Sequence, residues 1–423
     1  MDSLNTSTLL DVSELLSTIS ANILLDLPVF CEDTTEPYFR APASFLPIRE
    51  RREETLQNSV PLLQLPGTTI REILKTLTAE DAVSLGWSCR QLHGIIFGTE
   101  GELYWEQQLR VLQPSESLLR VASKPAETYR RCATMRRHWK QSQYTQSTVE
   151  GHMSLVKCIE LDGTRGVVVT GSSDKKVKVW KIDGKSLIMG KTIAGQNCGV
   201  VGLDLKGDDL RIGYKNGVIE DVNLSSGNSQ EFAVGSTVTG FTYCGEVVVG
   251  YERTVSLYDA KTLKSVGEYN LHRRPVSYAK LYTPQMGTSA SFDKSVDFWD
   301  LRKLDMTAIR LKGHHAGVNH FDFCKEKIIT ASNDKTLMVW DIRKPDVPIK
   351  TLQNHTAEVI YVRHQNDKVV ASSKDMTLSI FNDNDFSQIG MINTRSVVSS
   401  FIYDDQFMFC GCSSGEILMY DYS

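Results

Sequence analysis

Residues 313–341 have the sequence GHHAGVNHFDFCKEKIITASNDKTLMVWD, and this stretch decides the fold. Apolar residues alternate with polar ones in NHFDF and TLMVW, as they do in strands that bury one face. The segments CKEK and ASNDK supply the polar residues that tight turns between strands require. The stretch therefore predicts three short antiparallel strands, and much of the remaining chain repeats this unit.

A hydroxyl residue, an Asp and a Trp lie at offsets of four and six residues within this unit, and the same offsets recur twice elsewhere, each time with a His 26–28 residues before the Trp. The three sets are His314, Thr330, Asp334 and Trp340; His152, Thr170, Asp174 and Trp180; and His272, Ser289, Asp293 and Trp299. A chain of hydrogen bonds from Trp to hydroxyl to His to Asp would satisfy polar atoms between packed sheets, where an unpaired atom costs about 1–3 kcal/mol. These residues are therefore predicted to be structural.

The dipeptides Gly313-His314 and Trp340-Asp341 resemble the signature of the WD-repeat family, which implies a β-propeller. Alignment on Trp340 places these residues at the equivalent position of seven repeats: Trp180, Val222, Tyr258, Trp299, Trp340, Phe381 and Tyr420. The chain is expected to be mostly β, with a seven-bladed propeller over residues 142–423. The segment QSTVEGH, near residues 146–152, is expected to supply the outer strand of the last blade and to close the ring.

Residues 60–110 change the hydrophobic period from two to about 3.6, which predicts three short helices. A segment of about fifty residues cannot bury all its apolar side chains, so part of its surface should contact another protein. The segment resembles an F-box in the spacing of Leu65-Pro66, Ile73, Leu77, Asp81, Leu85, Cys89-Arg90 and Trp105, and departs from it at Thr68, Ala82, Ser88 and Leu92. The resemblance implies docking to the Skp adaptor, and through it to a cullin scaffold, by these residues: Leu65, Pro66, Ile70, Ile73, Leu74, Leu77 and Leu85.

The segments on either side of the F-box-like region differ in character. Residues 1–58 are rich in Ser, Thr, Asp, Glu and Pro, and are predicted to be largely disordered. Residues 111–141 are predicted to contain a helix that starts at Ser123 and carries its apolar residues mostly on one side. Proteins that combine an F-box with WD repeats join the two parts by a helical linker ending in an Arg-x-x-Trp-like sequence. Residues 136–139 resemble that ending, which implies a stiff spacer.

Composition and short motifs narrow the range of functions. The net charge of -4 and pI near 6.2 show no overall bias towards nucleic acid. The scattered cysteines have no metal-ligand spacing, so the sequence predicts neither a metal nor a cofactor site. No 18-residue apolar run exists, so a protein with no membrane role, in the cytoplasm and/or nucleus, is expected. GCSSG at 411–415 matches a hydrolase motif but falls where the repeats place a turn between two strands, so the chain is expected to be non-catalytic.

In a propeller, the turns beside each repeated His and Asp surround one mouth of the central channel. The residues predicted to bind a target there are Lys215, Tyr251, Arg253, Arg273, Arg274, Phe292, Lys374 and Arg395. This basic and aromatic set would suit an acidic or phosphorylated peptide. Two functions therefore stay open. One is a substrate receptor of a Skp-cullin-F-box ubiquitin ligase, and the other is a WD-repeat scaffold with no part in ubiquitination.

Overall fold

The computed structural model describes part of the N-terminal region and almost all of the C-terminal region. The described residues are 74, 79, 82, 96–98, 101–112, 124–233, 238, 240–244, 247–252, 254–259, 261–262, 264–303 and 307–423. They belong to two compact units: residues up to 112 with 123–129, and residues 113–122 with 130–423. The predicted disordered segment, 1–58, lies outside the described residues.

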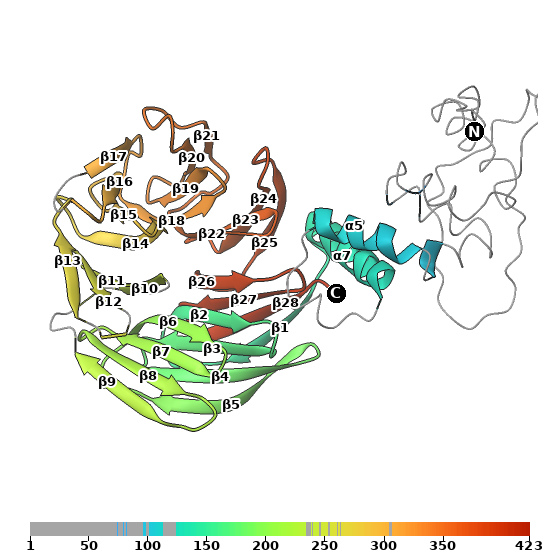
Figure 1. Cartoon of the computed structure of the whole chain (residues 1–423), viewed down its shortest axis with the longest axis horizontal. Helices are drawn as coiled ribbons and strands as arrows, with labels where there is room; N and C mark the ends of the chain where they lie inside the picture. The colour runs from blue at the N-terminus through green and yellow to red at the C-terminus, as the bar shows by residue number, and fades with distance from the viewer. Residues whose placement is uncertain are drawn as a thin grey trace, which may run out of the picture. The chain divides into compact units, whose positions relative to one another are not determined.

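The second unit is mostly β, and its strands form seven four-stranded antiparallel sheets arranged around a central opening (Figure 1). The first four sheets along the chain contain β2 (Val156–Asp162), β3 (Val167–Ser172), β4 (Lys176–Asp183) and β5 (Ser186–Ala194); β6 (Val200–Lys206), β7 (Asp209–Tyr214), β8 (Val218–Asn223) and β9 (Ser229–Ala233); β10 (Gly240–Cys244), β11 (Val247–Tyr251), β12 (Val255–Asp259) and β13 (Ser265–Tyr269); and β14 (Val276–Thr283), β15 (Met286–Ser291), β16 (Ser295–Asp300) and β17 (Thr307–Lys312). The other three contain β18 (Val318–Cys324), β19 (Lys327–Ser332), β20 (Leu337–Asp341) and β21 (Lys350–Leu352); β22 (Val359–Gln365), β23 (Lys368–Ser373), β24 (Thr377–Asn382) and β25 (Gln388–Asn393); and β26 (Val398–Tyr403), β27 (Phe407–Cys412), β28 (Glu416–Asp421) and β1 (Thr145–Glu150). This arrangement is a β-propeller.

The first strand of each hairpin series is the innermost, and it contacts the corresponding strand of the next sheet. These contacts run from β2 through β6, β10, β14, β18 and β22 to β26, which contacts β2 again. The hydrophobic cores lie between consecutive sheets; one, for example, combines Ile329 and Val339 of one sheet with Val362 and Phe381 of the next. Each sheet therefore buries both faces, which explains why strands such as β20 and β28 are apolar along most of their length.

The last sheet contains strands from both ends of the propeller. Strand β1 pairs antiparallel with β28, with Val149 opposite Ile417 and Gln146 opposite Tyr420. The prediction that residues near 146–152 complete this sheet is confirmed. Because β28 would otherwise have an unpaired edge, β1 satisfies its outward-facing backbone groups.

The predicted hydrogen-bond chain is present in two of the three sets. Trp340 Nε1 donates to Thr330 Oγ1 at 3.0 Å, and His314 lies 2.7 Å from both Thr330 Oγ1 and Asp334 Oδ2. The set that begins at His152 has the same bonds at 2.8–2.9 Å. Burial lowers the pKa of His152, although Asp174 opposes this effect, so the imidazole is neutral and donates to the Asp174 carboxylate.

The third set lacks its tryptophan bond, which corrects the prediction for Trp299. His272 contacts Ser289 at 2.8 Å and Asp293 at 3.0 Å, but Trp299 Nε1 has no hydrogen-bond partner among the described residues. The cross-strand partner of Trp299 is Gly287, and a Cβ there would lie 2.2 Å from the indole ring. The corresponding partners of Trp180 and Trp340 are Val168 and Ile328. The absent side chain therefore lets the Trp299 ring lie against the backbone.

A fourth network was not predicted. His355 contacts Asp375 Oδ2 at 3.1 Å and Ser379 Oγ at 2.7 Å. The hydroxyl of this network belongs to Ser379 on the third strand of the sheet. On the second strand, Ala371 stands where the sheet of His314 has Thr330. The signal was the 20-residue separation of His355 from Asp375, which equals that of His314 from Asp334.

The Asp of each network also shapes the turn that follows it. Asp334 Oδ1 accepts hydrogen bonds from the backbone N of Thr336 at 3.0 Å and from its hydroxyl at 2.6 Å. The intervening Lys335 has a φ of 73°, in the left-handed region, and Lys175, Lys294 and Met376 at equivalent places also have positive φ. The side-chain bonds hold a turn that residues other than glycine rarely adopt.

In the first unit, helix α5 (Glu102–Leu112) begins within residues 60–110, for which three short helices are predicted. Trp105 is 1% exposed and stacks on Phe97, and its Nε1 donates to the Ile96 carbonyl at 2.7 Å. Leu74 is also buried, at 2% exposure. Leu74 is one of the residues predicted to bind the adaptor, and that role stays a prediction. The other predicted adaptor-binding residues, Leu65, Pro66, Ile70, Ile73, Leu77 and Leu85, lie outside the described residues.

Helix α7 (Pro125–Gln141) begins two residues after the predicted start, because Pro125 lacks an N–H and suits the first helical position. Its C-terminal half belongs to the propeller unit. Trp139 stacks on Tyr422 with ring centroids 3.8 Å apart, and its Nε1 donates to the Asp405 carbonyl at 2.8 Å. Neither α7 nor any other described helix is long and apolar enough to cross a membrane.

Candidate functional site

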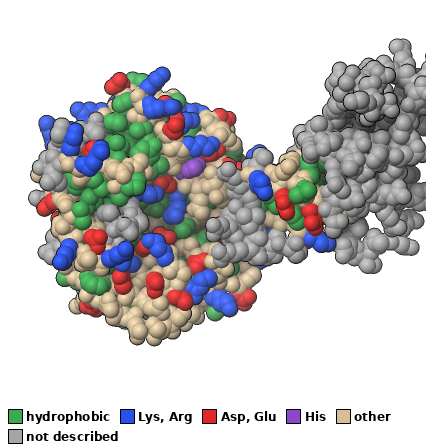
Figure 2. All heavy atoms as spheres, viewed as in Figure 1, with side chains coloured by type: hydrophobic (Ala, Val, Ile, Leu, Met, Phe, Trp, Pro, Cys, Tyr) green, Lys and Arg blue, Asp and Glu red, His purple; other side chains and the backbone are tan. Residues whose placement is uncertain are grey.

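The inner strands surround a cavity of about 940 Å³ at the centre of the propeller. Figure 2 shows Lys and Arg side chains at the centre of the visible propeller face, with hydrophobic side chains gathered beside them. All seven inner strands contribute to the cavity wall, so it is a surface shared by every sheet. Cavities of this size hold small ligands or the side chains of a bound peptide.

The register of the inner strands sorts the lining residues into layers. In every sheet the inner strand pairs with the second strand. Inner-strand residues are equivalent when they lie opposite the same position of the second strand in their respective sheets. Two such layers are Cys158, Gly202, Phe241, Tyr278, His320, Tyr361 and Ser400, and two positions further along, Glu160, Asp204, Tyr243, Lys280, Asp322 and Arg363. The first layer is aromatic on one side and small on the other, whereas the second is predominantly charged.

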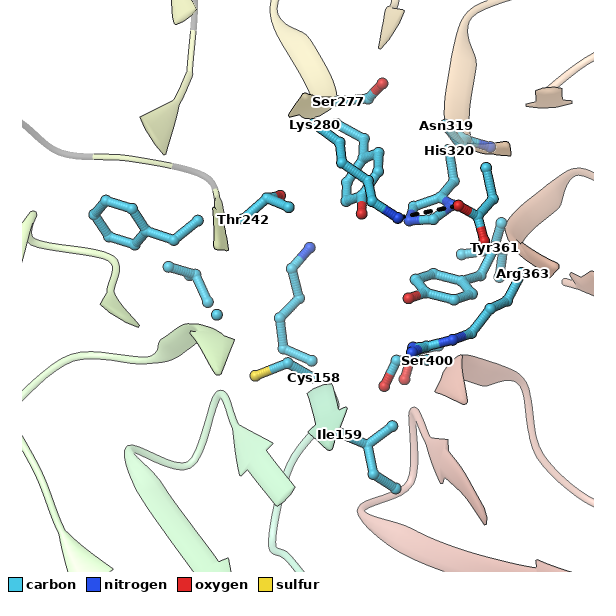
Figure 3. Close-up of a pocket in the computed structure, with 18 of the residues that line it drawn as sticks. Cys158, Ile159, Thr242, Ser277, Lys280, Asn319, His320, Tyr361, Arg363 and Ser400 are labelled. Atoms are coloured by element: carbon cyan, nitrogen blue, oxygen red, sulfur yellow. Dashed lines mark hydrogen bonds and ion pairs between the residues drawn. The ribbon is translucent and has the colours of Figure 1, made fainter. Parts of the chain in front are cut away.

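The aromatic side of the first layer is a continuous stack. His320 lies between Tyr278 and Tyr361, with ring centroids 3.9 Å apart on both sides. Figure 3 shows the rings of His320 and Tyr361 side by side. Neither ring nitrogen of His320 has a hydrogen-bond partner among the residues described. Burial lowers the pKa of His320 to about 3; Lys280 and Arg363 add to this effect and Asp322 opposes it. The imidazole is therefore neutral at physiological pH and packs as an aromatic ring.

The charged layer mixes both signs. Lys280 Nζ lies 3.2 Å from Asp322 Oδ1, the contact drawn in Figure 3, and Asp322 Oδ2 accepts a hydrogen bond from the His364 backbone at 2.9 Å. Burial raises the pKa of Glu160 to about 7, although Arg363 opposes it. Burial acts against the charge of Arg363, but Tyr361, Glu160 and Asp322 outweigh it and raise the pKa of the guanidinium. Glu160 can therefore take up or release a proton near neutral pH.

One cation of the cavity wall has no counter-ion in the part of the chain that the structure describes. Lys157 reaches the solvent of the cavity and has no carboxylate partner among the described side chains. The surrounding wall lowers the pKa of Lys157 by desolvation, and Lys215 adds a smaller effect of the same sign. An anion bound near Lys157 would remove this electrostatic cost, so the position favours a negatively charged ligand group.

Of the residues predicted to bind a target, some line the central cavity and others do not. Phe292, which is 38% exposed, and Lys374 line the cavity. Four others are exposed but do not line it: Lys215, Arg273, Arg274 and Arg395. Tyr251 ends strand β11, and Arg253 lies outside the described residues. The predicted patch is therefore not one continuous lining of the cavity.

The charged layer was not predicted, because the repeat motifs mark the turns and not the inner strands. A signal was nevertheless present in the strands VKCIELD, VSYAKLYT, VNHFDFC and VIYVRHQ, each of which contains a charged residue at the same register position. Those charges interrupt an apolar pattern that is otherwise typical of core strands. Such an interruption indicates a strand that faces a solvent-filled channel.

Comparisons with known proteins agree with this architecture. The sequence profile of the family described as "WD domain, G-beta repeat" matches residues 143–181 and 306–341. A solved structure, the WD40 β-propeller domain of Doa1, superposes with a TM-score of 0.59 over 66% of this chain and 97% of that one, at 19% identity. At that identity the likeness shows the fold alone. The chain therefore carries WD40 repeats on a β-propeller, a fold typical of protein-interaction scaffolds.

Two curated relatives come from Dictyostelium discoideum. One, "F-box/WD repeat-containing protein A-like protein", is 26% identical over 323 residues, which are 70% of this chain and 27% of the relative. The other, "Mitogen-activated protein kinase kinase kinase A", is 25% identical over 198 residues, covering 43% and 20% of the two chains. The chain thus spans about a quarter of the length of these relatives. The WD40 repeats are thus shown by the sequence profile, and the first relative shows a similarity to an F-box/WD-repeat protein.

Proposed function

We propose that this WD40-repeat chain is the target-recognition subunit of a Skp-cullin-F-box ubiquitin ligase. In this proposal residues 60–110 form a three-helix F-box that docks the Skp adaptor. Residues 111–141 are a helical linker, and residues 142–423 form a seven-bladed propeller that binds the target in the cytoplasm or nucleus. The observation that carries the proposal is an F-box-like segment before a WD40 propeller, in a chain similar to an F-box/WD-repeat protein.

The charges of the propeller support an acidic or phosphorylated peptide as the target. Lys157 lies at the cavity with no carboxylate partner among the described residues, and Lys374, at the same cavity, has a glutamate, Glu358, at 3.4 Å. The exposed Arg273 and Arg274 at the rim would attract an acidic chain before it enters. The stack of Tyr278, His320 and Tyr361 offers an apolar wall for a neighbouring side chain of that peptide.

The chain needs no catalytic residue for this role. A receptor that holds the adaptor at one site and the target at another raises the local concentration of target lysines at the ligase. The four F-box departures would weaken adaptor docking without changing the helical pattern. If docking fails, a WD-repeat scaffold with no part in ubiquitination remains as the second function.

The adaptor half of the proposal is tested by co-expressing the full chain with the Skp adaptor. Capture should be stoichiometric, and the Leu65→Ala/Pro66→Ala double variant should abolish it. The Arg273→Glu/Arg274→Glu double variant is the matched control, because its changes lie on the propeller and should leave adaptor capture intact. A folded chain that captures no adaptor would support the scaffold function instead.

The target half is tested with paired peptide libraries that differ only in phosphorylation. Lys157→Ala and Arg273→Glu/Arg274→Glu should each weaken binding of phosphorylated or acidic peptides by about tenfold or more, since charge-assisted hydrogen bonds contribute about 1.5–3 kcal/mol. Lys264→Glu, an exposed change outside the cavity lining, should have no effect. Equal binding by all variants would remove the cavity mouth from the site.

A further inference from the structure

Three side chains that bind metals in many proteins converge between two neighbouring sheets. Cys324 ends strand β18, His364 lies in β22, and Asp383 follows β24. The Sγ of Cys324, a ring nitrogen of His364 and a carboxylate oxygen of Asp383 all lie within 4.8 Å of one another. These residues are far apart in the sequence, which explains why cysteine spacing predicts no metal site.

The Cys324 thiol donates to the Asp383 carbonyl at 3.8 Å, but two polar atoms of this cluster lack hydrogen bonds to any described residue. Asp383 is 3% exposed, and its Oδ1 has no partner among the described residues. The Nε2 atom of His364 is also buried without a hydrogen bond to any described residue, and its 3.6 Å distance from Asp383 Oδ2 is too long for one. Buried polar atoms are almost always paired, so two orphan atoms aimed at one place indicate a missing partner.

The donor set decides what that partner is. Thiolate, imidazole and carboxylate together are a ligand set of Zn²⁺, whereas Mg²⁺ and Ca²⁺ prefer oxygen atoms alone. A nucleophilic role for the cysteine does not fit, because Cys324 is 1% exposed and no substrate can reach it. Burial, together with Asp383, raises the pKa of the Cys324 thiol to about 11, so a cation must displace its proton in order to bind.

We propose that Cys324, His364 and Asp383 bind one Zn²⁺ ion, with the fourth position open to water. Only small movements are needed to bring the three donor atoms to zinc-ligand distances of about 2.0–2.3 Å. The bound ion would join the sheets of β18 and β22 at a place where nothing covalent links them.

The surroundings leave both an entry path and a free carboxylate oxygen. His364 lines the central cavity, so an ion can reach the cluster from the solvent there. Lys325 Nζ lies 3.0 Å from Asp383 Oδ2 and 3.1 Å from Asn384 Oδ1. Because Lys325 is bound to Oδ2, the Oδ1 atom remains available to the metal. The exposed lysine therefore neutralises part of the carboxylate without blocking the site.

The test uses the full chain, freed of metal and titrated with Zn²⁺ against a chromophoric chelator. One Zn²⁺ per chain is expected, together with a rise of the thermal midpoint on Zn²⁺ addition. Cys324→Ala and Asp383→Asn should each weaken affinity by at least about 100-fold, since losing even an outer-shell partner costs 10–100-fold. Cys412→Ala removes an equally buried thiol outside the cluster and should bind Zn²⁺ like the unmodified chain.

A second measurement does not depend on any variant folding. Co²⁺ added to the unmodified chain should produce a thiolate-to-cobalt charge-transfer band with a one-to-one end point. The proposal is overturned if the folded chain shows no such band, or if either cluster variant that remains folded by circular dichroism keeps the affinity of the unmodified chain. A negative result for Zn²⁺ binding would not change the expected results of the adaptor and peptide experiments. The zinc proposal and the proposed function can therefore be rejected independently.

Discussion

The indole nitrogen of Trp340 donates a 3.0 Å hydrogen bond to the hydroxyl of Thr330, whereas the equivalent nitrogen of Trp299 is buried without a partner. The two tryptophans are alike in burial, at 1% and 0% exposure. They therefore form a natural pair for measuring what the hydrogen-bond chain contributes to stability.

Replacing either tryptophan by phenylalanine removes a similar volume from the core. Only the replacement of Trp340 also removes a hydrogen bond. Trp340→Phe should lower the free energy of unfolding by about 1 kcal/mol more than Trp299→Phe does. Urea unfolding of both variants measures the difference. Equal losses would mean that the Trp340 bond adds nothing beyond packing.

Asp334 makes more contacts than any tryptophan in this network. Its carboxylate accepts from His314, from the backbone of His315, and from both the backbone and hydroxyl of Thr336. Asp334→Ala should therefore destabilise the propeller by about 2–4 kcal/mol, because it leaves buried donors unpaired. Asp346→Ala, at an exposed turn residue, is the control and should leave the melting midpoint nearly unchanged. A midpoint that does not move for Asp334→Ala would contradict the structural role of the network.

Acid should destabilise the fold through its buried histidines. An unfolded histidine has a pKa near 6.5, whereas burial lowers that of folded His320 to about 3 and also lowers those of His152 and His355. The unfolded state therefore binds more protons below pH 6.5, so stability is present above that pH and is lost as the pH falls. Below about pH 4 the lowered pKa values of Asp174 and Asp375 add a further loss of the same sign.

The contribution of His320 can be isolated with His320→Phe, which keeps the stack with Tyr278 and Tyr361. Between about pH 6 and pH 4 the unmodified chain should lose about 1.4 kcal/mol more per pH unit than this variant. Urea unfolding at several pH values gives both slopes. Parallel slopes would show that His320 is not protonated on unfolding.

Closure of the propeller by β1 predicts a sharp dependence on where the chain is cut. A chain starting at residue 124 keeps both α7 and β1 and should be monomeric. A chain starting at residue 143 should fold with a lower melting midpoint, because it loses the Trp139 stack on Tyr422. A chain starting at residue 151 also loses β1 and should associate through the unpaired edge of β28. Size-exclusion chromatography with melting curves separates the three, and a monomeric, stable 151 chain would contradict the closure.

Much of the propeller was predictable because its repeats are marked by polar residues at fixed spacing. The positions of His314, Asp334 and Trp340 predicted the turns and the third strand of their sheet. The segment QSTVEGH predicted the closing strand. The missing bond of Trp299 was not predictable, since it depends on Gly287 across the strand rather than on any residue of the motif.

The candidate site was less predictable than the fold, for a geometric reason. Inner strands bury one side against a neighbouring sheet and face the channel with the other, so Glu160 or Arg363 differs from a core residue only by its charge. Phe292 and Lys374 were found because they stand in turns that the repeat pattern marks. The cluster of Cys324, His364 and Asp383 could not be predicted, because its residues are far apart in the sequence and meet only when two neighbouring sheets have folded and packed.

The pairing of β1 with β28 has a consequence during synthesis on the ribosome. The two partners lie roughly 270 residues apart, so at about 5–20 residues per second β1 emerges some 15–55 s before its partner exists. Throughout that interval every completed sheet belongs to an open arc whose two end faces are uncovered. The nascent propeller must therefore be shielded from other chains until its final strand has been translated, and chaperone demand should peak just before that moment.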